Sequence, residues 1–227
     1  MLVIFSIFFQ FNKNSLNTFP QSGNIIDVIV GKKTLFESRI IQQFIIKDSN
    51  LGFIDLAISF PKTLPDHPVP ILFILGGLET GFESVRYVTD IGDNILVGYN
   101  WPIDSKLPKG INLLIESPAI YRKIYKAPAQ IATAIEWVQK QPWAEKERVS
   151  LLGFSIGAIV VPAVQNIIES RGLATIGWTV LAYGGTNIGQ IVNSNPFISP
   201  KWTKPFLGYI IQLLFNPIDP KEHLEYI

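Results

Sequence analysis

One serine stands between two glycines in the part of the sequence with the clearest chemical potential. Gly153, Ser155 and Gly157 follow the pattern Gly-x-Ser-x-Gly. Where a strand precedes this pattern and a helix follows it, the chain must turn so sharply that only glycine fits on either side of the serine. The serine oxygen then stands above the sheet at a helix N-terminus, where amide groups favour developing negative charge. The pattern predicts nucleophilic attack on a carbonyl group, and the alternative is a tight turn with an inert serine.

Apolar segments around the motif predict the elements that position this serine. Residues 148–152 (RVSLL) indicate a buried strand, and residues 156–171 indicate the helix that follows, with Pro162 inside it. Short apolar runs of the kind found in parallel sheets predict further strands at 71–75, 94–99, 111–115 and 175–182. Strands that alternate with helices indicate the α/β class, with a mostly parallel sheet and helices on both faces.

A second helix and a strand pair are predicted upstream. Pro128 suits the first position of a helix, because its missing N–H would be unpaired there, and Pro142 would end that helix. Residues 39–47 and 51–60 predict an antiparallel pair of strands around a turn at 48–50. Apolar residues recur at the spacing of one buried helix face at Ile131, Ala134, Ile135 and Val138.

The chain divides into three predicted regions. Residues 1–24 combine an apolar run at 1–11 (MLVIFSIFFQF) with a polar linker, residues 25–190 form the core domain, and residues 191–227 resemble a lid or insertion. In this last region, residues 206–215 predict an apolar helix that serves either a lid or the core. The run at 1–11 is shorter than the roughly 20 residues that span a bilayer. It is compatible with export, with membrane association or with packing on the domain, so exported, periplasmic and cytoplasmic locations all stay open.

The segment RVSLLGFSIGAIVVP, which contains Ser155, resembles the nucleophile elbow of α/β-hydrolases. It is most similar to the dienelactone-hydrolase-like and serine-esterase branches, and the resemblance covers residues 36–190 in element order. The resemblance implies that Ser155 is the nucleophile and that the turn LGGLETG contributes to an oxyanion hole, although the family's usual His-Gly is replaced there. It assigns the donors to the N–H of Ile156 and to that of Gly77 or Leu78, with a plain glycine turn as the alternative.

The same resemblance implies a catalytic acid and then a histidine after the serine. His67 precedes the serine and is interpreted as a solvated residue of a proline-rich loop. His223 is the candidate base and Asp219 the candidate acid, since they follow the serine and would share a helix face at a spacing of four. This pair does not match the pattern of the family.

Strands that would carry the family's acid and base are not predicted after residue 185. We therefore expect a C-terminally truncated fold that lacks its last strands, together with the catalytic Asp and His. The strand at 175–182 would then be a sheet edge with unpaired backbone groups. This edge predicts self-association or low stability unless a partner covers it.

Composition narrows the classes of partner. The chain has 19 basic and 18 acidic residues and a net charge of +1, so no nucleic-acid partner is indicated. It has no cysteine and two histidines, which excludes disulfides and a thiol nucleophile and argues against a bound metal. No cofactor is expected.

Two functions stay open. The first is a serine hydrolase that cleaves a small-molecule ester or acyl substrate through Ser155, with activity that falls steeply if no histidine acts as base. The second is a non-catalytic protein of the same fold that binds a ligand or partner, or an inactive remnant.

Overall fold

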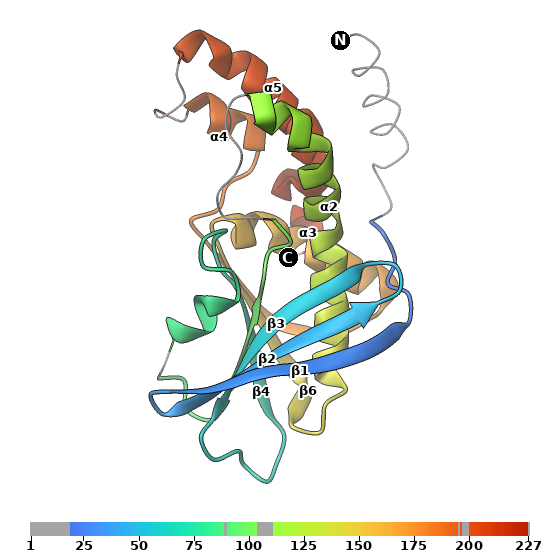
Figure 1. The fold of residues 1–227 in the computed structure, drawn as a ribbon, viewed down its shortest axis with the longest axis vertical. Coiled ribbons are helices and arrows are strands. Elements are labelled where there is room, and N and C mark those ends of the chain that lie inside the picture. Colours follow the sequence, from blue (N-terminus) through green and yellow to red (C-terminus); the bar gives the residue numbers. More distant parts are fainter. Residues whose placement is uncertain (1–18, 89, 104–110, 195, 197–199, 227) are drawn as a thin grey trace.

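The computed structural model describes residues 19–88, 90–103, 111–194, 196 and 200–226. Its strands are β1 Ile25–Phe36, β2 Arg39–Asp48, β3 Gly52–Pro61, β4 Val69–Leu75, β5 Ile95–Tyr99, β6 Ala144–Phe154 and β7 Ile176–Ala182. They form one sheet in the order β1-β2-β3-β5-β4-β6-β7 (Figure 1). The pairs from β1 to β5 in this order are antiparallel, and those from β5 to β7 are parallel. The mostly parallel part of the sheet is therefore the part that holds the serine motif.

Helices flank the sheet on both faces, as the sequence predicts. The α-helices are α2 Ile111–Gln139, α3 Ile156–Arg171, α4 Ile188–Ser194 and α5 Lys204–Phe215. The short 3₁₀ segments are η1 Gly81–Arg86, η2 Lys201–Thr203, η3 Asn216–Ile218, η4 Pro220–Glu222 and η5 Leu224–Tyr226. α2 and α3 cover the larger hydrophobic core on one face, and η1 covers a smaller core on the other.

The predicted apolar face of the helix before the motif is confirmed. Ile131, Ala134, Ile135 and Val138 are all fully buried in the core between α2 and the sheet. Burial of a large aliphatic side chain contributes about 1.5–3 kcal/mol. This face therefore anchors the C-terminal half of α2 against the sheet.

The predicted start of this helix is wrong. Residues 111–115 form the first part of α2 instead of a strand, and Pro118 and Pro128 both lie inside the helix. A short apolar run does not distinguish a buried strand from a helix, so the pattern alone misassigned it. Proline in a helix interior costs about 3 kcal/mol. The buried face from Ala127 to Val138 is large enough to outweigh that cost.

The antiparallel strand pair is confirmed, and the structure adds a strand before it. β2 and β3 pair from Arg39 opposite Pro61 to Asp48 opposite Gly52. The Asp48 carboxylate closes the turn by accepting the N–H groups of Asn50 and Leu51, each at 2.8 Å. β1 was not predicted, because its side chains are mostly exposed and its sequence lacks a regular apolar alternation.

β7 lies at one end of the strand order, as the sequence predicts for residues 175–182. Trp178 and Val180 on this strand are exposed.

The predicted domain boundary at residue 190 falls within α4. The apolar run at 1–11 lies outside the described residues. Among the helices of the described residues, none has the length and apolar character needed to cross a membrane.

Candidate functional site

Ser155 occupies the turn between β6 and α3 with a strained backbone. Its φ of 55° and ψ of −117° lie in a region that residues other than glycine rarely adopt. Two hydrogen bonds hold the turn: the Ser155 N–H donates to the Ala182 carbonyl at 3.2 Å, and the Ser155 carbonyl accepts the Ile159 N–H at 3.3 Å. The residue is exposed. Such strain is typical of functional positions, where the surrounding structure imposes the conformation.

The two flanking glycines are required by close packing. A Cβ at Gly157 would lie 1.9 Å from the Leu75 carbonyl oxygen, and one at Gly153 would lie 2.8 Å from backbone atoms of Gly157 and Ala158. Any side chain at either position would push α3 away from β4 or β6. The steric reason that the spacing suggests for these glycines is therefore met in the structure.

The turn after β4 lies beside the serine. A Cβ built on Gly77 would be 3.9 Å from the Ser155 Cβ, so the two backbones are close neighbours. The Gly77 carbonyl accepts the N–H of Thr80 at 3.2 Å, the Thr80 hydroxyl at 3.0 Å and the Gly81 N–H at 3.0 Å. This carbonyl points into its own turn. Leu78 continues the turn from this point of closest approach.

Both segments stand at the same edge of the parallel sheet. Ser155 follows the carboxyl end of β6, and Gly77 follows that of β4, its parallel neighbour. The chain leaves β4 for β5 on one side and later returns to β6 on the other, so the connections diverge at this point. Ligands of open α/β sheets bind at such a switch point, outside the carboxyl ends of the strands.

A pocket of about 390 Å³ opens beside the turn after β4. Ser155 does not line it, but Leu78, the residue next to Gly77, does. Its other walls come from the rest of this turn with the start of η1, from the segment after β5 and from one residue of α2. They include Glu79, Thr80, Glu83, Asn100, Trp101 and Lys123. The lining is mixed, with carboxylate, amide, hydroxyl, ammonium and indole groups. Such a lining suits a ligand that carries several hydrogen-bonding groups.

Polar contacts, one buried and one exposed, fix the wall of this pocket at the end of β5. The Trp101 indole N–H donates to the Gly76 carbonyl at 3.1 Å, and the Asn100 amide donates to the Asp55 carboxylate at 3.0 Å. Burial raises the pKa of Asp55, and the hydrogen bond from Asn100 lowers it in part. The buried Tyr99 hydroxyl donates to Gln130 at 2.5 Å. Sequence reasoning missed Asn100 and Trp101, although their place directly after a predicted strand was a usable signal.

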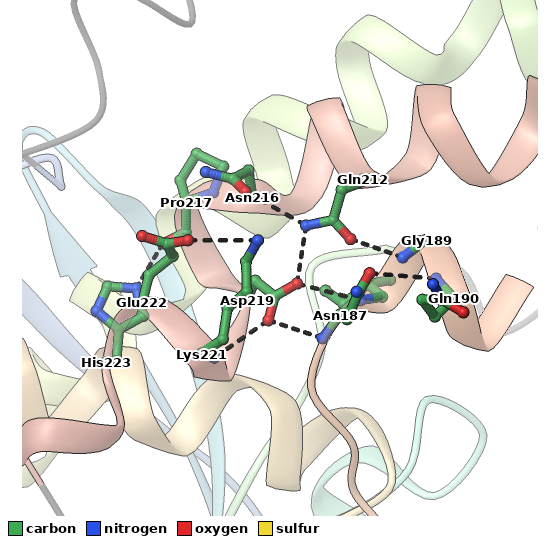
Figure 2. Close-up of polar contacts among 11 residues, drawn as sticks. Asn187, Gly189, Gln190, Gln212, Asn216, Pro217, Asp219, Lys221, Glu222 and His223 are labelled. Atoms are coloured by element: carbon green, nitrogen blue, oxygen red, sulfur yellow. Dashed lines mark hydrogen bonds and ion pairs between the residues drawn. The ribbon is translucent and has the colours of Figure 1, made fainter.

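Asp219 is fully buried and serves as an anchor for chain segments (Figure 2). Its carboxylate accepts the Asn187 N–H at 3.0 Å, the Ile188 N–H at 3.1 Å, the Gln212 amide at 2.9 Å and the Lys221 N–H at 3.1 Å. Burial acts to raise the pKa of Asp219, but these hydrogen bonds outweigh burial and hold the pKa below its ordinary value. The carboxylate thus joins α4, α5 and η4.

His223 lies near Asp219 in the sequence but has separate partners. Its Nε2 lies 2.8 Å from the Pro217 carbonyl oxygen and its Nδ1 2.9 Å from the Asn166 amide nitrogen. A carbonyl only accepts, so we assign the proton of the neutral ring to Nε2 and the acceptor role to Nδ1. The predicted helix face shared with Asp219 is wrong, because the chain is extended at Asp219 and forms separate 3₁₀ turns on either side.

The structure therefore brings together only part of the predicted site. Ser155, Ile156 and the turn at Gly77 and Leu78 are adjacent, but neither ring nitrogen of His223 contacts Ser155. His67 is exposed in the loop before β4, at the opposite edge of the sheet from Ser155, and lies 3.5 Å from Asp66. Across the described ranges, no cluster of three or more histidine, aspartate or glutamate side chains is placed to hold a metal ion.

Comparison with known proteins adds information on the fold. No family model and no curated protein matches the sequence. Acetyl xylan esterases from Paenibacillus sp. R4 and Thermoanaerobacterium sp. JW/SL YS485 superpose with TM-scores of 0.61 and 0.57, at 15% and 16% identity, over 97% of this chain and 75% of theirs. A candidate acetyl xylan esterase from Bacteroides fragilis gives a TM-score of 0.50 at 14% identity, over 69% of this chain and 50% of that protein. This chain thus spans half to three-quarters of their lengths, and at these identities the similarity concerns the fold alone.

Proposed function

We propose that this chain, which has the α/β-hydrolase fold, is a serine hydrolase that cleaves esters through attack by Ser155. The observation that carries the proposal is the strained, exposed Ser155 between two glycines that accept no side chain. An inert serine would have no reason to be kept in this conformation, because glycine would adopt it at lower cost.

The proposed reaction uses backbone amides to hold the developing oxyanion. The Ile156 N–H stands at the first position of α3, where a helix leaves its N–H groups without intrahelical partners. The second donor is the N–H of Gly77 or Leu78 in the neighbouring turn. As the Ser155 oxygen bonds to the substrate carbonyl carbon, its proton leaves and negative charge moves to the carbonyl oxygen between these donors. The alcohol departs with a proton, and water then releases the acyl group.

The proton acceptor limits the expected rate. Each histidine of the chain is engaged elsewhere, and no histidine contacts Ser155 among the described residues. Serine hydrolases without a working triad keep an acceleration of about 10³–10⁴ over water, from the oxyanion hole and binding. We expect turnover somewhat above this residual, because attack by Ser155 adds to it with solvent as the proton acceptor.

The proposed substrate is a short acyl ester of a hydroxyl-rich alcohol. Two proteins with the same fold are acetyl xylan esterases. The polar pocket beside Leu78 supports a similar class here, because Glu79, Asn100 and Lys123 offer both acceptors and donors to hydroxyl groups.

A second candidate is a binding protein of this fold without catalysis. It is favoured by the contacts of Asp219 and His223, which fasten chain segments to one another and do not reach the serine. In that case the pocket would bind its ligand and Ser155 would be an inactive residue of the turn.

Hydrolysis of p-nitrophenyl acetate separates these two candidates. We expect the purified chain to hydrolyse it above the buffer rate, and Ser155→Ala to lower the rate to the part that the oxyanion hole and binding supply without the serine. Ser170→Ala, on the last turn of the same helix, is the matched control and should leave the rate unchanged. Equal rates for the wild-type chain and Ser155→Ala would sink the hydrolase proposal.

A further inference from the structure

An exposed aromatic row runs along the outer face of η2 and α5. Trp202, Phe206 and Tyr209 are 80%, 57% and 54% exposed. Their spacing of four and then three residues places them on one side of a helix. Single large apolar side chains on a surface are common, whereas three exposed aromatic residues on one side of a helix indicate an interaction surface.

The opposite face of α5 packs against α4, so the aromatic row lies on the side of α5 that faces away from α4. Gly208 of α5 packs so closely on Gly189 of α4 that a Cβ on either would lie 2.6–2.7 Å from the other's carbonyl oxygen. Gln212 donates to Asp219 and accepts the Gly189 N–H at 2.8 Å. α4 and α5 lie side by side (Figure 1), and these contacts with the Asp219 anchor leave the three aromatic residues of α5 and η2 exposed.

The charges on the segment that carries the row have one sign. Lys201 and Lys204 flank Trp202, and both α4 and α5 lack acidic residues. Between Glu169 and Asp219 the sequence contains no Asp or Glu at all. The chain as a whole is nearly neutral, with 19 basic and 18 acidic residues, so this absence is local to the part that carries the row.

We propose that the row Trp202, Phe206 and Tyr209 docks on an anionic lipid surface. Tryptophan and tyrosine favour the boundary between headgroups and acyl chains, since an apolar ring and a polar N–H or O–H meet there. Lysines beside such a face add attraction to anionic headgroups, each worth roughly a few-fold in affinity. Protein interfaces also favour Trp, Tyr and Phe but are depleted in Lys, so the two lysines beside the row favour the lipid surface.

The helices that carry this surface follow the carboxyl edge of the parallel strands, the edge at which Ser155 also lies. α4 follows the carboxyl end of β7, and the Ser155 N–H is hydrogen-bonded to the last residue of that strand. Docking through α5 would bring this edge of the sheet toward the lipid. The proposal stands independently of the proposed hydrolase function, because it concerns binding alone.

Vesicle co-sedimentation of the full chain tests the proposal. The vesicles contain phosphatidylcholine alone or with about one-third phosphatidylglycerol. We expect binding to the anionic vesicles and a loss of affinity of about tenfold or more when the three aromatic residues of the row are removed. That variant is Trp202→Ser, Phe206→Ser and Tyr209→Ser. The matched control removes three apolar residues of β7 and its end, as Trp178→Ser, Val180→Ser and Tyr183→Ser, and should bind like the wild-type chain.

A variant with two milder substitutions tests the proposal even if the triple variant misfolds. Lys201→Gln with Lys204→Gln should reduce the preference for anionic over neutral vesicles by several-fold, with an unchanged melting temperature. Equal vesicle binding by the wild-type chain and the row variant would overturn the proposal, as would equal losses in the row variant and the control. A dimer in lipid-free solution that the row variant abolishes, without vesicle binding by the wild-type chain, would assign the row to a protein interface instead.

Discussion

Replacing Asp219 by alanine tests whether this carboxylate is a structural anchor. Four hydrogen bonds end on it, and Asp219→Ala would leave their donors without that acceptor. Loss of a buried acceptor costs about 1–3 kcal/mol for each donor left unpaired. Asn187 and Lys221 are exposed and can turn to water, whereas Ile188 and Gln212 are partly buried. Two such donors give a loss of about 3 kcal/mol in the free energy of unfolding.

This loss should appear as a lower melting temperature with a defined pH dependence. For a chain of this size, about 3 kcal/mol lowers the midpoint by roughly 6–12 °C. The pKa of Asp219 is lowered from 3.8 in the folded chain, so its contribution is complete at neutral pH and is lost as the pH falls through the folded pKa. The difference between wild type and Asp219→Ala should therefore be constant near neutrality and shrink below about pH 4.

Thermal unfolding followed by circular dichroism is the assay, with Asp66→Ala as the matched control in an exposed loop. We expect the control to melt like the wild-type chain. A midpoint for Asp219→Ala within about 2 °C of wild type would refute the anchor reasoning. If the variant instead stays as stable as wild type but loses all ester hydrolysis, Asp219 acts in catalysis.

Three further predictions concern backbone strain and close packing. Ser155→Gly should raise the free energy of unfolding by about 1 kcal/mol in denaturant titration, because glycine adopts the observed φ of 55° without strain, and should lower hydrolysis as much as Ser155→Ala does. Gly157→Ala should lose about 1–3 kcal/mol and most activity, whereas Gly177→Ala, whose Cβ would have ordinary contacts, should retain its activity. Arg39→Met should lower the free energy of unfolding by about 2–3 kcal/mol, measured by thermal unfolding. The reason is that the buried guanidinium donates to Ser59 and to the carbonyls of Gly92 and Asn94.

The parallel half of the fold was predictable from sequence because its strands are short, continuous apolar runs. β4, β5 and β7 coincide with such runs, as does the second half of β6, which begins at Ala144 and not at the predicted residue 148. The glycine at each end of the serine motif has a steric cause. β1 was not predictable in this way, since an exposed edge strand needs no apolar pattern. The start of α2 was misassigned because burial of its later turns, and not local preference, carries the helix through Pro128.

Sequence predicted only those parts of the site whose residues are neighbours along the chain. The turn at Ser155 is encoded within five residues, and the turn at Gly77 follows directly from the end of β4. Asn100 and Trp101 follow a predicted strand directly, which marks them as candidates, but the parallel pairing of β5 with β4 is what brings them to the pocket beside the turn after β4. The i, i+4 spacing of Asp219 and His223 suggested a pair, but Pro220 breaks the helix that such a pair would need.

Reaction with a fluorophosphonate, followed by peptide mass spectrometry, tests the central claim most directly. We expect one adduct per chain, located on the peptide that contains Ser155, and no adduct in folded Ser155→Ala. An unmodified Ser155 in the folded chain, or equal labelling of other serines, would contradict the claim that this turn holds an activated nucleophile.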